Sequence, residues 1–153
     1  MITGTYQTTT GLHNHRSSRT KAGAINLPAG ITTIPQLFRK HGYLTFNSGK
    51  EDYNFIFENS DLYSIKGPRR DFGAWRNLPK GKPWFGQIQL AGGKSNTKKW
   101  NDKVNPDSVT PPPYLPNTAL FRKWHAHHYD TVRQTDDDTR KILANLKADG
   151  LLE

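Results

Sequence analysis

The sequence predicts an α/β fold: a mostly parallel sheet with flanking helices and long loops. A helical pattern over residues 34–41 ends at a glycine and runs directly into an apolar strand pattern over residues 43–48. A second strand pattern covers residues 83–90, and both strands are followed by glycine and then lysine, at Lys50 and at Lys94. Ligands of open α/β sheets bind beyond the carboxyl ends of the strands. We therefore expect the two lysines to converge on one anion, although each could also be an ordinary exposed lysine.

The composition limits the classes of protein that the chain can represent. Its 153 residues are enough for one domain with a modest core. Only 33% of them are hydrophobic and the mean hydropathy is −0.82. This apolar content is low for an α/β domain, whose inner strands are nearly continuous apolar runs. We therefore expect either a loop-rich chain or a piece of something larger. The absence of cysteine excludes disulfides and thiolate metal sites, and the sequence shows neither a membrane-spanning apolar run nor a signal peptide.

The charge of the chain points to an anionic partner. The formal net charge is +9 and the sequence pI is near 9.9. Such a balance favours nucleic acid, anionic lipid, or sulfated and phosphorylated substrates. The positive residues are spread along the chain without a long tract, so a solvated basic surface explains them equally well.

The first 20 residues read as an extended loop with at most a short helical turn at its start. His13, His15 and Arg16 form a polar cluster in this loop. Two histidines two positions apart in an extended segment point to the same side. That arrangement suits a metal ion or an anion, and it is equally consistent with a surface loop.

Residues 32–50 give the clearest local pattern. Thr32 or Thr33 can cap a helix whose first turn contains Pro35. After the strand that ends at Lys50, we expect residues 51–82 to be irregular, with Asp52 just past the lysine. A long last helix is expected to begin after a cap at residue 117 or 118 and to run to about residue 149.

Several of these stretches follow one another in a specific order: the start MITGTYQTTTGLHNHRS, the block 34–50 with its Gly-Tyr and Gly-Lys pairs, the strand that begins with PWF, and the later stretches PPYLPNT and LKADGLL. Together they resemble the sulfatase family of the alkaline-phosphatase-like superfamily. The resemblance covers nearly the whole chain, and we interpret residues 1–153 as a single incomplete segment of a sulfatase catalytic domain. The implied fold is a partial alkaline-phosphatase-like α/β domain.

The chain also departs from the family pattern. The resemblance implies a formylglycine nucleophile, made from Cys or Ser in a Cys/Ser-x-Pro-x-Arg motif, and this sequence contains no such motif. The paired aspartates and the Asp-Asn or Asp-His pair that hold the family's calcium are also missing. We therefore expect calcium in the full-length family enzyme and none held by this segment, which we expect to be inactive by itself.

The resemblance assigns roles to individual residues. Lys50 matches the family's active-site lysine, whose charge can hold sulfate oxygens and the nucleophile's hydroxyl. Lys94 takes the place of a histidine that protonates the leaving oxygen, so the implied catalytic residues are Lys50 and Lys94. Many relatives have a histidine two positions after the lysine, where this chain has Asp52. The expected contacts to the sulfated substrate are His13, His15, Arg16 and Asp52.

The resemblance implies a sulfuric ester hydrolase that acts on sulfate esters or sulfamates, including those of glycans. The partner would be a sulfated small molecule or glycan and no nucleic acid, and the oligomeric state stays open. A full-length relative would be periplasmic, secreted or lysosomal, and the compartment of this protein stays open. One alternative is a non-catalytic binder of sulfated glycans. The other is a basic nucleic-acid-binding module that would use Arg69, Arg70, Lys98 and Lys99 with the stacking platforms Trp75 and Trp100.

Overall fold

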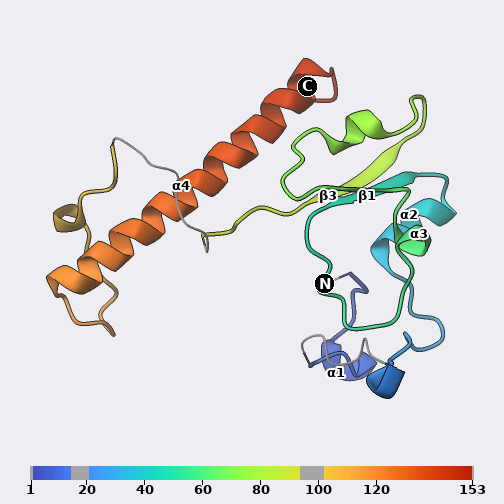
Figure 1. Ribbon diagram of the computed structural model, residues 1–153, viewed down its shortest axis with the longest axis horizontal. Coiled ribbons are helices and arrows are strands. Elements are labelled where there is room, and N and C mark those ends of the chain that lie inside the picture. Colours follow the sequence, from blue (N-terminus) through green and yellow to red (C-terminus); the bar gives the residue numbers. More distant parts are fainter. Residues whose placement is uncertain (1, 15–20, 94–101, 153) are drawn as a thin grey trace. The chain divides into compact units, whose positions relative to one another are not determined.

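The structure is a computed structural model that describes residues 2–14, 21–93 and 102–152 (Figure 1). The chain divides into two compact units, Met1–Gln89 and Leu90–Glu153. The first unit contains the sheet, and the second contains the long helix α4 (Ala119–Ala148). Whether the two units together form the single domain expected from the sequence stays a prediction.

The sheet of the first unit has three parallel strands in the order β2-β1-β3. Strand β1 (Leu44–Ser48) lies between β2 (Ile65–Gly67) and β3 (Trp84–Ile88). The expected α/β class, with a parallel sheet and flanking helices, is confirmed. Strands β1 and β3 correspond to the two predicted strands and are parallel neighbours. The prediction that residues 51–82 are irregular is wrong in part, because β2 and a short helix lie in that range.

The register places one row of polar residues across the sheet near the carboxyl ends of its strands. Asn47 on β1 is paired with Lys66 on β2 and with Gln87 on β3. Asn47 is buried, as are its strand neighbours Thr45 and Ser48. Alternate residues of a strand point to opposite faces, so this polar row shares one face of the sheet with Thr45.

Helix α2 (Ile34–Lys40) forms where the sequence predicted a helix, and Thr33 is its cap. The Thr33 hydroxyl accepts a hydrogen bond from the backbone N–H of Gln36 at 3.4 Å, and the Gln36 side chain accepts one from the backbone N–H of Thr33 at 3.1 Å. This reciprocal pair satisfies two donors that the first turn of a helix otherwise leaves unpaired. Pro35 in the first turn has no N–H to satisfy.

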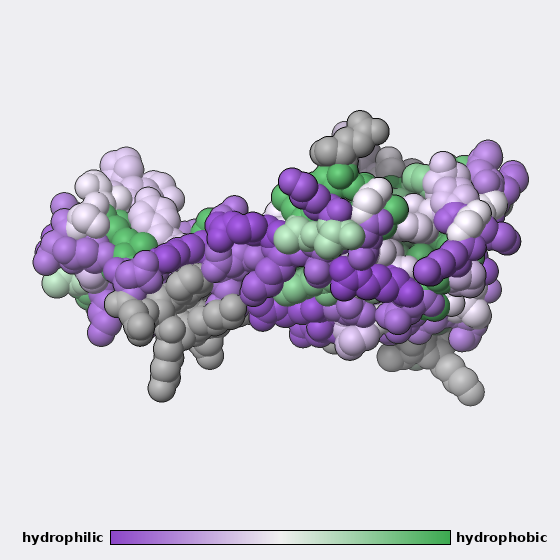
Figure 2. All heavy atoms as spheres, turned by 90° about the horizontal axis from the view of Figure 1, so that it is seen from above, coloured by the Kyte–Doolittle hydropathy of each residue, from purple (hydrophilic) through white to green (hydrophobic). Residues whose placement is uncertain are grey.

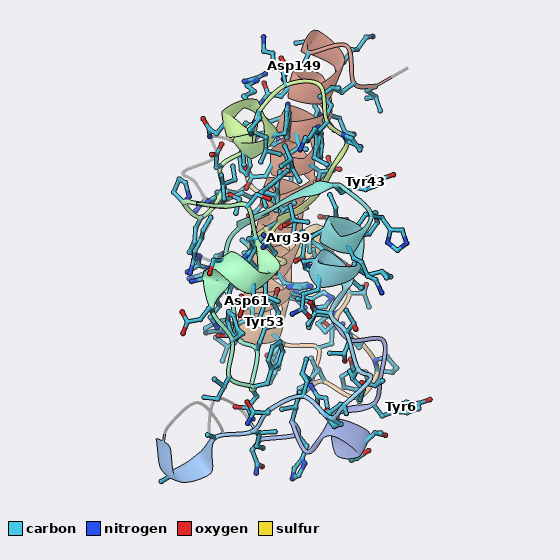
Figure 3. All side chains as sticks on the ribbon, turned by 90° about the vertical axis from the view of Figure 1, so that its right-hand side faces the viewer. Tyr6, Arg39, Tyr43, Tyr53, Asp61 and Asp149 are labelled. Carbon is cyan, nitrogen blue, oxygen red and sulfur yellow. The ribbon has the colours of Figure 1, made fainter. Side chains whose placement is uncertain are left out.

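Short helices pack on the sheet from both sides (Figure 1). Helix α2 lies beside α3 (Asn59–Leu62), and the two are joined by the Arg39 guanidinium, which donates to the carbonyl oxygen of Ser60 (Figure 3). The ring of Phe38 on α2 stacks on Phe85 of β3 with centroids 4.5 Å apart. On the other face, Trp75 stacks on Trp84 at 5.8 Å.

Apolar packing around the loops completes the first unit. Phe55, Leu62 and Tyr63 form a buried cluster, and partly buried side chains from the N-terminal segment, including Ile2 and Leu12, pack against it. This packing brings helix α1 (Gln7–Thr10) to the same end of the unit. Tyr6, before α1, points away from it and is exposed (Figure 3). The remaining short helices are 3-10 turns at Lys21–Gly23, Ala74–Asn77 and Pro106–Ser108.

Helix α4 of the second unit begins after Thr118, whose side chain accepts from the backbone N–H of Phe121. The Asp130 carboxylate on α4 is buried and accepts from the backbone N–H of Val104 at 3.2 Å, which ties the preceding segment to the helix. In the run Asp136 to Asp138, the first two aspartates pair with Arg140, and Asp138 is fully buried and pairs with Lys141. Hydrophilic residues dominate the face of the molecule seen in Figure 2.

Candidate functional site

The carboxyl ends of β1 and β3 open into a pocket of about 520 Å³ in the first unit. Asn47 and Lys50 from the end of β1 line it, and so do Gln87 and Gln89 from the end of β3. Open α/β sheets bind ligands at this edge because the loops after neighbouring parallel strands diverge there. The pocket is within the range of volumes that hold small ligands.

The turn that carries Lys50 is built against the end of β3. The backbone N–H of Lys50 donates to the Gln89 side-chain oxygen at 2.7 Å. A Cβ atom at Gly49 would lie 2.6 Å from the Cβ of Gln89, so no larger residue fits at this position without a shift of the backbone. Glycine before the lysine therefore allows the close approach of the two strand ends.

The Lys50 side chain forms an ion pair with Asp52, two residues later, and both side chains line the pocket. Both are partly accessible, so the pair is solvated and contributes little to stability. An anion that enters the pocket has to share the ammonium group with the Asp52 carboxylate. The carboxylate of Asp52 therefore opposes anion binding, while the charge of Lys50 favours it.

The N-terminal segment forms another wall of the pocket. The Asn54 side chain donates to the backbone carbonyl of Asn14, which joins the loop after Lys50 to the segment around His13. His13, Asn14 and Asn54 all line the pocket, and the His13 side chain is exposed. The imidazole is thus available to a ligand in the pocket.

A pair of tyrosines supports the wall next to β3. The Tyr63 hydroxyl donates to the Gln87 side-chain oxygen at 2.8 Å, and the Tyr53 hydroxyl lies within hydrogen-bond distance of both groups. Burial raises the pKa of Tyr63 above its ordinary value, and the hydrogen bond with Tyr53 and the nearby charge of Glu51 raise it further. Burial also raises the pKa of Tyr53, against the opposing effect of its bond with Tyr63. Both phenols therefore stay protonated at neutral pH.

The donor set of this pocket suits an oxyanion and does not suit calcium. Its positive group is an ammonium, and amide and hydroxyl groups surround it. Calcium needs six to eight oxygen ligands, several of them carboxylates. Asp52 is the only carboxylate that lines the pocket within the described residues, and it is paired with Lys50. Across the same residues, no cluster of three or more His, Cys, Asp or Glu side chains is arranged to hold a metal ion.

The structure places three of the six predicted site residues together. Lys50, Asp52 and His13 line the one pocket. Their roles in catalysis and substrate binding stay predictions. The other three predicted residues lie outside the described part of the chain: His15, Arg16 and Lys94.

Sequence reasoning missed the amide side chains of the site. Asn47, Gln87 and Gln89 line the pocket at the carboxyl ends of their strands. A signal was available, because a polar residue near the end of a predicted inner strand is out of place unless it faces a ligand or a partner. Tyr53 and Asn54 followed Lys50 too closely in the sequence to be distinguished from the rest of their loop.

Trp75, which the sequence offered as a stacking platform, has a structural role. Trp75 is buried and stacks on Trp84, so it anchors its loop and does not offer a free ring face for base stacking. His127 on α4 lines a separate pocket of about 620 Å³ in the second unit, together with Trp124 and Leu120. No described helix has both the length and the apolar character needed to cross a membrane.

The fold and the pocket define the class as an α/β protein with an anion-suited site at the carboxyl edge of a parallel sheet. No family model matches the chain. It is similar to an ulvan-active sulfatase of Formosa agariphila, with 23% identity over 204 residues, and the match covers 100% of this chain and 33% of the relative. The chain thus spans about a third of the length of the sulfatase it matches. The similarity is distant and points to the sulfatase family, and the α/β fold is compatible with part of such a domain.

Proposed function

We propose that this chain carries the lysine-bearing part of the active site of a sulfuric ester hydrolase. In this proposal Lys50 binds the sulfate group of a sulfated small molecule or glycan. The observation that carries it is the pocket at the ends of β1 and β3, which brings Lys50, His13 and several amide donors together. The distant similarity to a sulfatase supports the same reaction class.

The distribution of charge supports an anionic ligand at this pocket. The unit Met1–Gln89 contains twelve Lys and Arg against five Asp and Glu, a formal net charge of +7. The unit Leu90–Glu153 contains ten against eight, which gives +2. The excess that indicates an anionic partner is therefore concentrated in the unit that holds the pocket, where it would raise the local concentration of a sulfated substrate.

Each pocket group has a physical part in the proposed binding. The Lys50 ammonium is a compact charge that can contact a sulfate oxygen, and the side-chain N–H groups of Gln89 can donate to the other oxygens. In this proposal the His13 imidazole, which lines the same pocket, donates to the ester side of the substrate. Groups held in place before the substrate arrives stabilise developing negative charge without reorganisation.

Hydrolysis also needs a nucleophile. The family resemblance implies formylglycine, whose hydrated form would attack the sulfur atom. Calcium has no part in this proposed step, because the described pocket lacks a suitable donor set. The hydrolytic part of the proposal requires a Cys/Ser-x-Pro-x-Arg motif encoded beside this segment, and the adjoining coding DNA can be read to check it. Its absence would favour the non-catalytic binder of sulfated glycans.

Binding of inorganic sulfate to the full chain tests the role of Lys50. Titration calorimetry at fixed ionic strength, with chloride as the competing anion, should show that Lys50→Ala weakens sulfate binding about tenfold, which corresponds to about 1.4 kcal/mol. Lys80→Ala is the matched control, since Lys80 is exposed and outside the pocket lining but carries the same charge. Equal weakening by the two variants would show that sulfate responds only to net charge.

A further inference from the structure

Glu51 lies between the two charged pocket residues Lys50 and Asp52, and it points the other way. Its side chain is 5% exposed, whereas those of Lys50 and Asp52 are 42% and 28% exposed. Glu51 does not line the pocket. A carboxylate removed from water costs several kcal/mol unless donors replace its hydration, so its partners decide what this residue does.

The partners of Glu51 come from three different elements. The Lys66 ammonium on β2 donates to Oε2 at 2.6 Å, and the Asn47 amide on β1 donates to Oε1 at 3.3 Å. The Asn59 amide on α3, with its nitrogen turned toward Glu51, donates to both carboxylate oxygens at 3.0 Å. Asn47 and Lys66 are paired across the sheet. The Glu51 carboxylate is therefore fixed to the row of polar residues near the carboxyl ends of the strands.

The turn that carries Lys50 is thus held from two sides. On one side the Glu51 carboxylate is attached to β1, β2 and α3. On the other side the Lys50 backbone N–H is attached to Gln89, directly after β3. Lys50 itself has a long and flexible side chain, and a fixed backbone limits the directions in which its ammonium group can point.

We propose that Glu51 is a positioning residue: its buried carboxylate holds the turn that points Lys50 into the pocket. The inference rests on the proposed anion binding by Lys50, and it names Glu51 as the residue that holds Lys50 in position for that binding. Replacing a buried ion pair by apolar residues is often neutral for stability, so the buried Glu51 carboxylate is better explained by the geometry that it fixes than by stability.

Positioning and simple electrostatics predict opposite results for one substitution. Glu51→Gln removes a negative charge near an anion site. By Coulomb's law alone that change strengthens sulfate binding. If Glu51 positions Lys50, the same change weakens sulfate binding, because the neutral amide loses the ion pair with Lys66 and its NH2 group cannot accept from the donors that now meet the carboxylate, so the turn is held less firmly.

The neighbouring residue offers a matched control for the same charge change. Asp52→Asn also removes one negative charge, but it does so inside the pocket, where Asp52 competes with the anion for Lys50. We expect Asp52→Asn to strengthen sulfate binding about threefold or more and Glu51→Gln to weaken it by a similar factor. Stronger sulfate binding in both variants would overturn the positioning role.

A third variant tests the inference without a change of charge. Asn59 is exposed and outside the pocket lining, so Asn59→Ala should leave the chain folded while it removes one of the partners of Glu51. It should weaken sulfate binding in the same direction as Glu51→Gln. Unchanged binding in Asn59→Ala, with a thermal melt like that of the wild type, would contradict the proposal.

The reactivity of Lys50 separates this inference from the proposed function. Acetic anhydride labels exposed lysines, and mass spectrometry gives the rate at Lys50 relative to that at Lys80. We expect Glu51→Gln and Asn59→Ala to change this ratio about twofold or more, whether or not sulfate binds. A wild-type protein that does not bind sulfate would overturn the proposed function, whereas an unchanged labelling ratio would overturn the positioning role.

Discussion

The sheet of the first unit and the exposed surface of α4 hold their polar groups in different ways. In the unit Met1–Gln89, polar side chains are buried and held by residues far away in the sequence: the Thr45 hydroxyl donates to the carbonyl of Leu62 at 2.7 Å, and the Ser48 hydroxyl donates to that of Pro68 at 2.5 Å. In α4, the exposed Arg140 pairs with Asp136 at 3.0 Å within one turn of the same helix. Loss of a hydrogen-bond partner from a buried polar group lowers the free energy of unfolding strongly, whereas loss of a solvated ion pair lowers it little. Substitutions around the sheet should therefore lower the free energy of unfolding more than substitutions on the exposed surface of α4.

The largest effect is expected at Gly86 on β3. A Cβ at this position would lie 2.0 Å from the ring of Phe46, which is 1% exposed and cannot move aside. Gly86→Ala should therefore lower the free energy of unfolding by about 2–3 kcal/mol, as overpacked cores do. Chemical denaturation followed by tryptophan fluorescence measures the change.

A glycine on β2 is the matched control for this prediction. A Cβ at Gly67 would lie 3.5 Å from its nearest neighbours, which is ordinary contact. Gly67→Ala should change the free energy of unfolding by only about 0.5 kcal/mol. Equal losses for Gly86→Ala and Gly67→Ala would mean that the packing of Phe46 on β3 is not as the structure shows.

An intermediate effect is expected from the tyrosine pair at alkaline pH. The pKa of Tyr63 is raised above its ordinary value of 10.0 in the folded protein, so above pH 10 the unfolded chain loses this proton and the folded chain keeps it. Proton loss in the unfolded state alone favours unfolding, so the stability present below pH 10 falls as the pH rises further. The slope for one such tyrosine is about 1.4 kcal/mol per pH unit.

Denaturation midpoints at pH 7, 10 and 11 test this dependence. Tyr63→Phe should be less stable than the wild type at pH 7, by about 1–2 kcal/mol, because it loses the hydrogen bond to Gln87. The difference from the wild type should shrink between pH 10 and pH 11. Tyr114→Phe removes an exposed hydroxyl of the second unit and serves as the control. A constant difference across the pH range would contradict the raised pKa.

The smallest effect is expected on the surface of α4. Arg140→Ala removes the ion pairs of the exposed Arg140 with exposed Asp136 and half-buried Asp137, and it should lower the free energy of unfolding by no more than about 0.5 kcal/mol. The loss should disappear in 1 M salt, where charges at the surface are screened. A loss as large as that of Gly86→Ala would remove the contrast between the sheet and the surface of α4.

Local sequence was sufficient for the elements whose pattern is complete within a short stretch. The apolar stripe, a cap at Thr32 or Thr33 and Pro35 predicted α2, and a cap at residue 117 or 118 predicted the start of α4. The structure uses Thr33 and Thr118 as the caps. Both predicted strands formed within two residues of their expected ends. Strand β2 could not be predicted in this way, because three residues, Ile65–Gly67, contain no period and form a strand only through pairing with β1.

For the candidate site, the sequence alone determined that Lys50 and Asp52 follow the carboxyl end of a strand, because that placement depends only on their position after a recognisable strand pattern. The tertiary structure decided which distant residues join them. His13 reaches the pocket through the contact of Asn14 with Asn54, 40 residues later. Only the tertiary structure shows that Glu51 is buried while Lys50 lines the pocket. Neighbouring charged residues look alike in a sequence, and it is the donors on β1, β2 and α3 that make Glu51 a buried group.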